Sequence, residues 1–580
     1  MASTLTHEET KKEIKKVVLG KEITTDSRRV NEWVSAVCAV LVFIGGIFAF
    51  VVGNEKPDKL FWDENYYLSF VEKYLHGTFF MHAHPPLAIM FLALGEKLLN
   101  PNKDIDKKWI HDNDFVDRVP PGYSFKGVRF FPGLFAAGVG VLIFLIIYRV
   151  TKHHFTSVGF AAIYLMDTAG ICHHRAAMLD STLIFFILLA VWKFIDMVLK
   201  PKTTHADYII LGFSVGLAMA TKFTAWFLLI LPVLIYLKQR WRFIRWHIRM
   251  AFQLVLIPLL TINRAEKEKN KGTRQMYWEM FFIRGARDAV VFIVPLLISF
   301  LGVWTIHIKL TPNPVGNLYS ASDYYKEKIL AGQGGSIFVL PVAILDNIKY
   351  GYKLHTDIAP LSYDNPNEMG SHPLFWPLGI RSISYRWDSQ GDEVRYKRLV
   401  ANPFTWSVGL IGLIMSMTML LGRIFYGIVP KDRLIANAIC MMMWIWLAYM
   451  LPLYGLERVM YLYHYFPPLI FTYIMAGLVF YYIFYRCFPR MTSFIPNVIL
   501  SLALVFGFWV MKQYLPLAIH DPPLRAHQVE RLAIFKPWRL QPAPVGQAAP
   551  QPPPAAQAPA PTETTVQEAP QPPPNPAPSK

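Results

Sequence analysis

The stretch 128–149, "VRFFPGLFAAGVGVLIFLIIYR", is an apolar run of membrane-spanning length with an arginine near each end. About 20 predominantly apolar residues suffice for a helix to cross the hydrocarbon core of a bilayer. Similar runs recur along the 580 residues, of which 53% are hydrophobic and 17% are charged. An average soluble domain has roughly 25% charged residues. The sequence therefore predicts an all-α polytopic membrane protein.

Eleven spans are expected from the apolar runs. They are placed at about 33–53, 128–149, 156–172, 180–199, 207–221, 223–238, 288–307, 404–422, 434–453, 463–484 and 494–514. The fifth and sixth runs are short and meet at Lys222. The stretch 250–263 is too short to span and lies between basic residues, which favours an interfacial or half-inserted segment.

Lysine and arginine in short loops set the orientation, because they are enriched on the cytoplasmic side of membrane proteins. With the N-terminus inside, every strongly basic loop faces the cytoplasm, and the stretch 238–287 alone contains 12 Lys and Arg. These loops account for the formal net charge of +18 without a nucleic-acid partner. The first span begins too far into the chain for a cleavable signal peptide and indicates a signal anchor.

The spans divide the chain into a membrane domain and flanking segments. We expect a cytoplasmic segment at 1–31, a transmembrane domain at 32–515 with outer loops at 54–127 and 308–403, an extracytoplasmic segment at 516–540 and a disordered tail rich in Pro, Ala and Gln at 541–580. No internal repeat is found. The four cysteines suggest no disulfide framework and leave the redox compartment undetermined.

Ionisable residues gather at the outer ends of the predicted spans. They come from five separate stretches and comprise Asp63, Glu64, His82, His84, Arg175, Asp180, Lys222, Arg458 and His464. Such groups near hydrocarbon usually mark a functional site. A carboxylate can take a proton from a hydroxyl nucleophile, and Arg or Lys can hold a phosphate. The combination indicates group transfer from a lipid-linked phosphate to an acceptor that arrives from the aqueous side.

The same residues resemble the protein O-mannosyltransferase family of GT-C glycosyltransferases. The motifs occur in the family's order from about residue 61 to 485: "DE" at 63–64, "FFMHAHPPL" at 79–87, "RAAMLDS" at 175–181, Lys222, "HPLFWPL" at 372–378, "NP" at 402–403 and "YHYFPP" at 463–468. The resemblance implies the family's eleven-span, N-inside arrangement. It also implies transfer of mannose from a polyprenyl phosphate to Ser or Thr of exported proteins.

Carried over by motif, the resemblance makes Asp63 the catalytic base and Glu64 its acidic partner. We expect Arg175 to bind the donor phosphate, with help from Lys222 and Arg458. The residues expected to bind substrate or to position the loops are His84, Pro85, Asp180, Trp376, His464 and Tyr465. The expected mechanism is an inverting single displacement in which the lipid phosphate leaves without a general acid.

Two departures from the family pattern are visible. His82 stands where the family usually has an aspartate, and Ala88 and Ile89 follow "HPPL" in place of its usual Gly-Lys ending. The loop therefore differs from the family pattern at the positions on either side of "HPPL". The stretch 308–403 is also too short for the MIR repeat domain of eukaryotic members, which points to the bacterial type.

Structural readings compete at several positions. Asp63 and Glu64 could cap a helix, Arg175 could extend to the interface from a span end, and His464 and Tyr465 could simply pack among aromatics. Lys222 and Arg458 are equally explained as span-end cations. His82 and His84, two residues apart, could bind a metal with a nearby acid, although no metal is favoured.

The sequence thus predicts a membrane mannosyltransferase with no resident cofactor and a lipid-linked sugar as donor. Its expected partners are that lipid and an exported protein acceptor, and a homo- or heterodimer stays open. The expected location is a bacterial inner membrane with the site facing outward, with the endoplasmic reticulum as the alternative. Two other functions remain: a related GT-C enzyme that moves another sugar to a lipid or glycan, and a transporter or flippase for a lipid-linked substrate.

Overall fold

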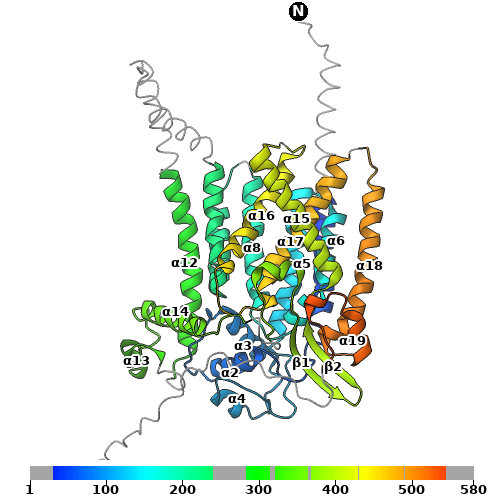
Figure 1. The fold of residues 1–580 in the computed structure, drawn as a ribbon. Coiled ribbons are helices and arrows are strands. Elements are labelled where there is room, and N and C mark those ends of the chain that lie inside the picture. The colour runs from blue at the N-terminus through cyan, green and yellow to red at the C-terminus, as the bar shows by residue number, and fades with distance from the viewer. Residues whose placement is uncertain are drawn as a thin grey trace, which may run out of the picture.

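The structure is a computed structural model and describes residues 30–200, 202–239, 283–313, 320–362, 368–428, 430–488 and 490–543. The expected segments at 1–31, 250–263 and 541–580 lie wholly or almost wholly outside these residues. The long helices run side by side, and a layer of short helices and strands covers one of their ends (Figure 1).

Eight helices in the described part of the chain are long and apolar enough to span a membrane. They are Val30–Phe50, α5 (Phe130–Thr151), α8 (Asp180–Leu199), α12 (Arg284–Leu310), α15 (Pro403–Tyr426), α16 (Arg433–Tyr454), the continuous segment Leu462–Cys487 and α18 (Phe494–Ile519). The segment Leu462–Cys487 comprises η5 (Leu462–Tyr465), α17 (Phe466–Tyr481) and η6 (Tyr482–Cys487). The prediction of an all-α polytopic membrane protein is confirmed.

Three of the eleven expected spans take other forms. The third is a pair of helices, α6 (His154–Leu165) and α7 (Thr168–His174), bent by 62°. Asp167 at the break caps α7 by accepting a hydrogen bond from the Gly170 N–H (3.3 Å). The fifth and sixth are the shorter apolar helices α9 (His205–Met219) and Phe223–Gln239, and the latter opens with the 3-10 segment η1 (Phe223–Leu229).

Small residues allow close contact between the spanning helices. An added Cβ at Gly212 of α9 would lie 2.3 Å from the Phe292 carbonyl oxygen of α12, so the two backbones touch at this point. The α9 helix also packs against α8, which packs against α5, while α17 packs against α15 and α16. The resulting core is continuous through the bundle.

The covering layer is built from the two predicted outer loops and the segment after α18. It contains α2 (Glu64–Leu75), α3 (Leu87–Leu99), α4 (Lys108–Asp112), α13 (Asp323–Leu330), α14 (Leu340–Thr356), η4 (Pro373–Leu378), β1 (Ile383–Gln390), β2 (Glu393–Leu399), β3 (Leu524–Arg525), α19 (Ala526–Leu532) and η7 (Lys536–Trp538). The three strands form one antiparallel sheet in the order β1-β2-β3. All of these loops therefore lie at the same end of the bundle, as the sequence predicted (Figure 1).

Candidate functional site

Asp63 is held at the start of α2 by a strained neighbour. Trp62, which precedes it, has a φ of 56°, a left-handed conformation that bulky residues rarely adopt. The Trp62 ring is buried and contacts the rings of Tyr385 and Tyr461, each with centroids 5.1 Å away. Strain of this kind persists only where the surrounding packing imposes it and is common at functional sites. Asp63 itself is half-buried.

Glu64, next to Asp63, is fully buried and fully engaged. Its two carboxylate oxygens accept hydrogen bonds from Nε and Nη2 of Arg129, each at 2.8 Å, and both side chains are completely shielded from solvent. The Ala177 N–H donates a third bond to Glu64 (2.8 Å). Arg129 also donates to the carbonyls of residues 54, 55, 57 and 59. Glu64 therefore ties α2 to the start of α5 and to the loop after α7.

Asp180 connects three parts of the chain. Its Oδ1 accepts a hydrogen bond from Nζ of Lys222 (2.8 Å), and its Oδ2 lies 3.0 Å from Nε2 of His173. The other nitrogen of His173, Nδ1, lies 2.7 Å from the Tyr385 hydroxyl. This buried chain of polar groups runs from η1 through α8 and α7 to β1.

The charge of this network reaches Asp63. Burial raises the pKa of the Asp63 carboxyl to about 7, the Lys222 cation opposes that shift, and the Asp180 carboxylate adds to it. A carboxylate with a pKa near neutral is suited to accept a proton at physiological pH. Asp63, Asp180 and Lys222 thus share one electrostatic environment.

The loop before α3 places two histidines beside the same network. The Leu87 N–H donates to the Ala220 carbonyl (3.0 Å), which joins the "HPPL" segment to the residues just before Lys222. Nδ1 of His82 accepts a hydrogen bond from the His84 backbone N–H (3.1 Å). Burial lowers the pKa of His82 to about 3 and that of His84 well below its usual range. Pro85 is buried in this loop.

A third histidine, His355 of α14, meets this loop from the second outer loop. Its ring centroid lies 5.3 Å from that of His84. Burial, together with the charges of Arg458 and Lys222, lowers the pKa of His355 to about 4. The charge of Arg458 acts on His355, and the backbone at Arg458 pairs with Pro360, just after α14. Arg458 thus joins the same group of side chains.

Arg175 has different contacts from those of Lys222 and Arg458. Its Nη1 and Nη2 donate to the carbonyls of Ala49 (2.9 Å) and Val52 (2.8 Å), at the outer end of the first helix. Its Nε is buried and forms no hydrogen bond with the part of the chain that the structure describes. Burial lowers the pKa of Arg175 to about 10, so it stays cationic at neutral pH. Phosphate binding by Arg175 stays a prediction, since two of its three nitrogens already hold the first helix.

The aromatic residues singled out by motif pack together. The Trp376 ring is fully buried, and its centroid lies 6.1 Å from that of His464 and 6.4 Å from that of Tyr465. Its Nε1 donates to the Ser371 carbonyl and hydroxyl, both at 3.1 Å. These contacts join η4 to η5 and support the wall of the site.

Sequence reasoning missed four participants: Arg129, His173, His355 and Tyr385. Arg129 at the start of a span carried a usable signal, because ionisable residues at membrane depth tend to have a role. His173 lies two residues before Arg175, and its position at a span end does not by itself distinguish a functional histidine from an interfacial one. Nothing in the local sequence singles out His355 or Tyr385, which reach the site through loops that are distant along the chain.

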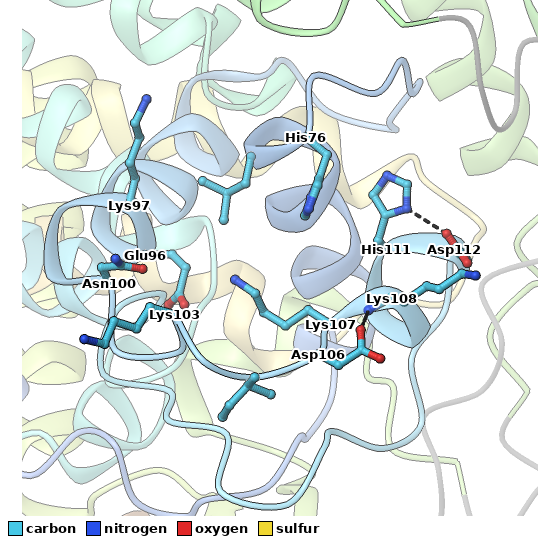
Figure 2. A pocket seen from close by; sticks show the side chains of 12 residues that line it. His76, Glu96, Lys97, Asn100, Lys103, Asp106, Lys107, Lys108, His111 and Asp112 are labelled. Atoms are coloured by element: carbon cyan, nitrogen blue, oxygen red, sulfur yellow. Dashed lines mark hydrogen bonds and ion pairs between the residues drawn. The ribbon is translucent and has the colours of Figure 1, made fainter.

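A separate cavity of about 910 Å³ lies in the covering layer between α2, α3 and α4. Figure 2 shows its lining, in which lysines, histidines and acids mix: Leu75, His76, Glu96, Lys97, Asn100, Lys103, Ile105, Asp106, Lys107, Lys108, His111 and Asp112. None of the predicted site residues lines it. In the described part of the chain, no group of three or more His, Cys, Asp or Glu side chains is arranged to hold a metal ion.

Comparisons with known proteins find mannosyltransferases among the relatives of this chain. Protein O-mannosyl-transferase 1 of Danio rerio is 27% identical over 202 residues, or 34% of this chain and 27% of that protein. Dolichyl-phosphate-mannose–protein mannosyltransferase 1 of Candida albicans is 27% identical over 258 residues, or 44% of this chain and 26% of that protein. The alignments thus span about a quarter of the length of these relatives.

A solved structure shares the fold. The S. cerevisiae protein O-mannosyltransferase Pmt1–Pmt2 complex bound to the sugar donor matches with a TM-score of 0.65 and 14% identity, covering 88% of this chain and 92% of that chain. The architecture is therefore of the GT-C type, as predicted.

Two family models account for most of the chain. The model for dolichyl-phosphate-mannose-protein mannosyltransferase matches residues 40–311. The model for the C-terminal four TMM region of protein-O-mannosyltransferase matches residues 353–538. The chain therefore belongs to the protein O-mannosyltransferase family, as its motifs implied.

Proposed function

We propose that this chain transfers mannose from a polyprenyl-phosphate-linked donor to Ser or Thr hydroxyls of exported proteins. The observation that carries the proposal is the position of Asp63 beside the Asp180–Lys222 ion pair. A proton acceptor with a pKa near 7 stands there next to cations that can face a phosphate. Family membership supports mannose and a protein acceptor as the substrates.

Asp63 acts as the general base of an inverting single displacement. It takes the proton of the acceptor hydroxyl as the hydroxyl oxygen forms its bond to the anomeric carbon. The bond from that carbon to the phosphate oxygen breaks, and its electron pair stays on the lipid phosphate. A positioned general base contributes typically about 10²–10⁴-fold to a rate.

Lys222 and Arg458 stabilise the negative charge that develops on the leaving phosphate. Electrostatic stabilisation by preorganised groups in a site sheltered from water is usually the largest catalytic term. Lys222 is held in place by Asp180, while Arg458 is half-buried in the loop that faces α14. Arg175, which follows α7 and contacts the end of the first helix, adds positive charge, because its pKa of about 10 keeps it cationic despite burial.

Glu64 positions Asp63 rather than exchanging protons with substrate. Its oxygens are occupied by Arg129 and by the Ala177 N–H, and it is shielded from solvent. His84, Pro85 and Asp180 shape the donor side of the site. Trp376, His464 and Tyr465 form the aromatic wall behind it.

The donor lipid enters from the membrane, and the acceptor arrives from the extracytoplasmic side. The reaction needs no resident cofactor, because the donor supplies its own phosphate leaving group. We assign the chain to a bacterial inner membrane on the absence of room for a MIR domain at 308–403. Dimer formation is a natural extension, since the S. cerevisiae relative was solved as a Pmt1–Pmt2 complex.

The test is to incubate the purified full chain with polyprenyl-phosphate-mannose and a peptide that contains Ser and Thr. The expected result is a mass gain of one hexose on the peptide and release of polyprenyl phosphate. Transfer of sugar to lipid alone would replace this function with the related GT-C activity. Movement of intact donor across vesicles, without transfer, would favour a flippase.

A further inference from the structure

Two histidine nitrogens beside the site lack partners among the described residues. Nδ1 of His84 and Nδ1 of His355 are each buried, and neither forms a hydrogen bond with any residue that the structure describes. The two rings come from different outer loops, 271 positions apart in the chain, and their centroids are 5.3 Å apart. A buried polar atom without a partner costs free energy unless a ligand or water completes it.

Backbone contacts hold these two loops together. An added Cβ at Gly351 of α14 would lie 2.7 Å from the Ala83 carbonyl oxygen. The α14 helix therefore contacts the loop at Ala83, the residue between His82 and His84. After α14, the Val459 N–H donates to the Ala359 carbonyl (3.0 Å), which fixes the distance between α14 and Arg458. Main-chain contacts before and after His355, at Gly351 and Ala359, therefore fix its position near His84.

Two cations lie close enough to act on the pair. The charges of Lys222 and Arg458 act on His355, and the charge of Lys222 also acts on His84. Lys222 forms an ion pair with Asp180, whereas Arg458 forms no salt bridge with a residue that the structure describes. Cations and imidazoles that can donate hydrogen bonds therefore lie near each other, a combination suited to a phosphate.

We propose that His84 and His355 form a hydrogen-bond subsite that favours the dianionic polyprenyl phosphate product over the phosphodiester donor. The inference rests on the proposed function for its choice of ligand. Neutral imidazoles attract a monoanion weakly and a dianion strongly, because a hydrogen bond strengthens with the charge of its acceptor. An interaction that grows as the phosphate gains charge lowers the barrier, whereas equal binding of donor and product would not.

His82 has a separate role beside this subsite. Its Nδ1 already accepts the hydrogen bond from the His84 backbone N–H, so it sets the conformation of the loop. This is the position where the family pattern has an aspartate. A carboxylate there would add negative charge beside the phosphate, and the neutral His82 avoids that repulsion.

The experiment compares two ligands on the purified full chain: a polyprenyl monophosphate and its methyl ester, which is a phosphodiester without a sugar. The variant His355→Phe keeps the ring volume and removes both nitrogens. It should lose about tenfold in affinity for the monophosphate and less than about twofold for the methyl ester. His355→Asn, which restores a donor near the Nδ1 position, should recover most of the loss.

A matched control is His527→Phe, at an exposed histidine of α19 outside the site. It should leave both affinities unchanged, and all variants should share the wild-type melting temperature. Unchanged binding of the monophosphate by His355→Phe would overturn the subsite, and so would an equal loss for both ligands.

These ligands carry no mannose, so the two proposals fail separately. If His355→Phe selectively loses affinity for the monophosphate but the wild-type chain transfers no mannose, the subsite stands and the proposed function falls. If mannose is transferred but His355→Phe binds both ligands normally, the function stands and the subsite falls.

Discussion

Lys222 Nζ lies 2.8 Å from Asp180 Oδ1, and each side chain is 8% exposed. The two residues are 42 positions apart, one at the start of a short apolar helix and the other at the start of α8. Their pair sets the electrostatic environment of Asp63, because Lys222 lowers the pKa of Asp63 and Asp180 raises it. The chemistry of the site therefore depends on this contact as much as on Asp63.

Replacing the proposed base tests the mechanism most directly. We expect Asp63→Asn to reduce the rate of mannose transfer by about 10²–10⁴-fold, because the amide cannot take the hydroxyl proton. Donor binding should change little, since the phosphate contacts remain. The measurement is transfer to a Ser/Thr peptide together with donor binding by the same preparation. Transfer at the wild-type rate would remove Asp63 from the mechanism.

The pH dependence of the wild-type enzyme follows from the same residue. The pKa of Asp63 is raised to about 7, and only its ionised form accepts a proton. The value of kcat/KM should therefore fall about tenfold per unit as pH drops below 7. Initial rates between about pH 5.5 and about pH 8.5 measure this limb. A flat profile across that range would contradict the assignment.

Removing the Lys222 charge should move that profile. Because the Lys222 cation lowers the pKa of Asp63, Lys222→Met should shift the acidic limb of kcat/KM to higher pH. Lys222→Arg retains the charge and should keep the limb near its original position. An acidic limb that does not move in Lys222→Met, in protein that still folds, would separate Lys222 from Asp63.

Glu64 should govern stability. Glu64→Gln leaves Arg129 as a buried, uncompensated cation, which costs about 3 kcal/mol of unfolding free energy. The matched control is Glu393→Gln, whose ion pair with Arg525 is exposed on both sides and should contribute less than about 1 kcal/mol. Denaturant titration of both variants in the same detergent gives the comparison. Equal losses would mean that burial of the Arg129 pair adds nothing.

The contact between α14 and the histidine loop can be tested with one methyl group. In Gly351→Ala the new Cβ would meet the Ala83 carbonyl, so α14 or the loop must shift. We expect transfer to fall several-fold with little change in melting temperature. Gly302→Ala, in α12, has open space around the added atom and should retain full activity. Full activity in Gly351→Ala would show that the position of α14 does not matter.

Patterns within short stretches of sequence predicted the spanning helices and the placement of the large loops. Apolar length identified the spanning helices, and the basic loops predicted that both large loops share one end of the bundle. The shapes of the third, fifth and sixth spans were not predictable. Asp167 breaks the third because its hydrogen bonds to Thr405 and Trp406, more than 230 positions away, stabilise the bend.

In the site, too, the features that depend on contacts between distant segments were not predictable. Asp63, Asp180 and Lys222 were identified from motifs and do lie together. The engagement of Glu64 with Arg129 and the arrival of His355 depend on pairing between distant segments, which no local periodicity encodes. Arg175 illustrates the ambiguity of a cation at a span end, since it holds the first helix through two carbonyls.

The main-chain pairing of residues 359–361 with 457–459 has a mechanical consequence. The second outer loop and the loop between α16 and α17 are fastened to each other, so neither can swing aside alone. A displacement of one segment would therefore carry the other with it. Arg458 and His355 lie on the two paired segments, so they would move together.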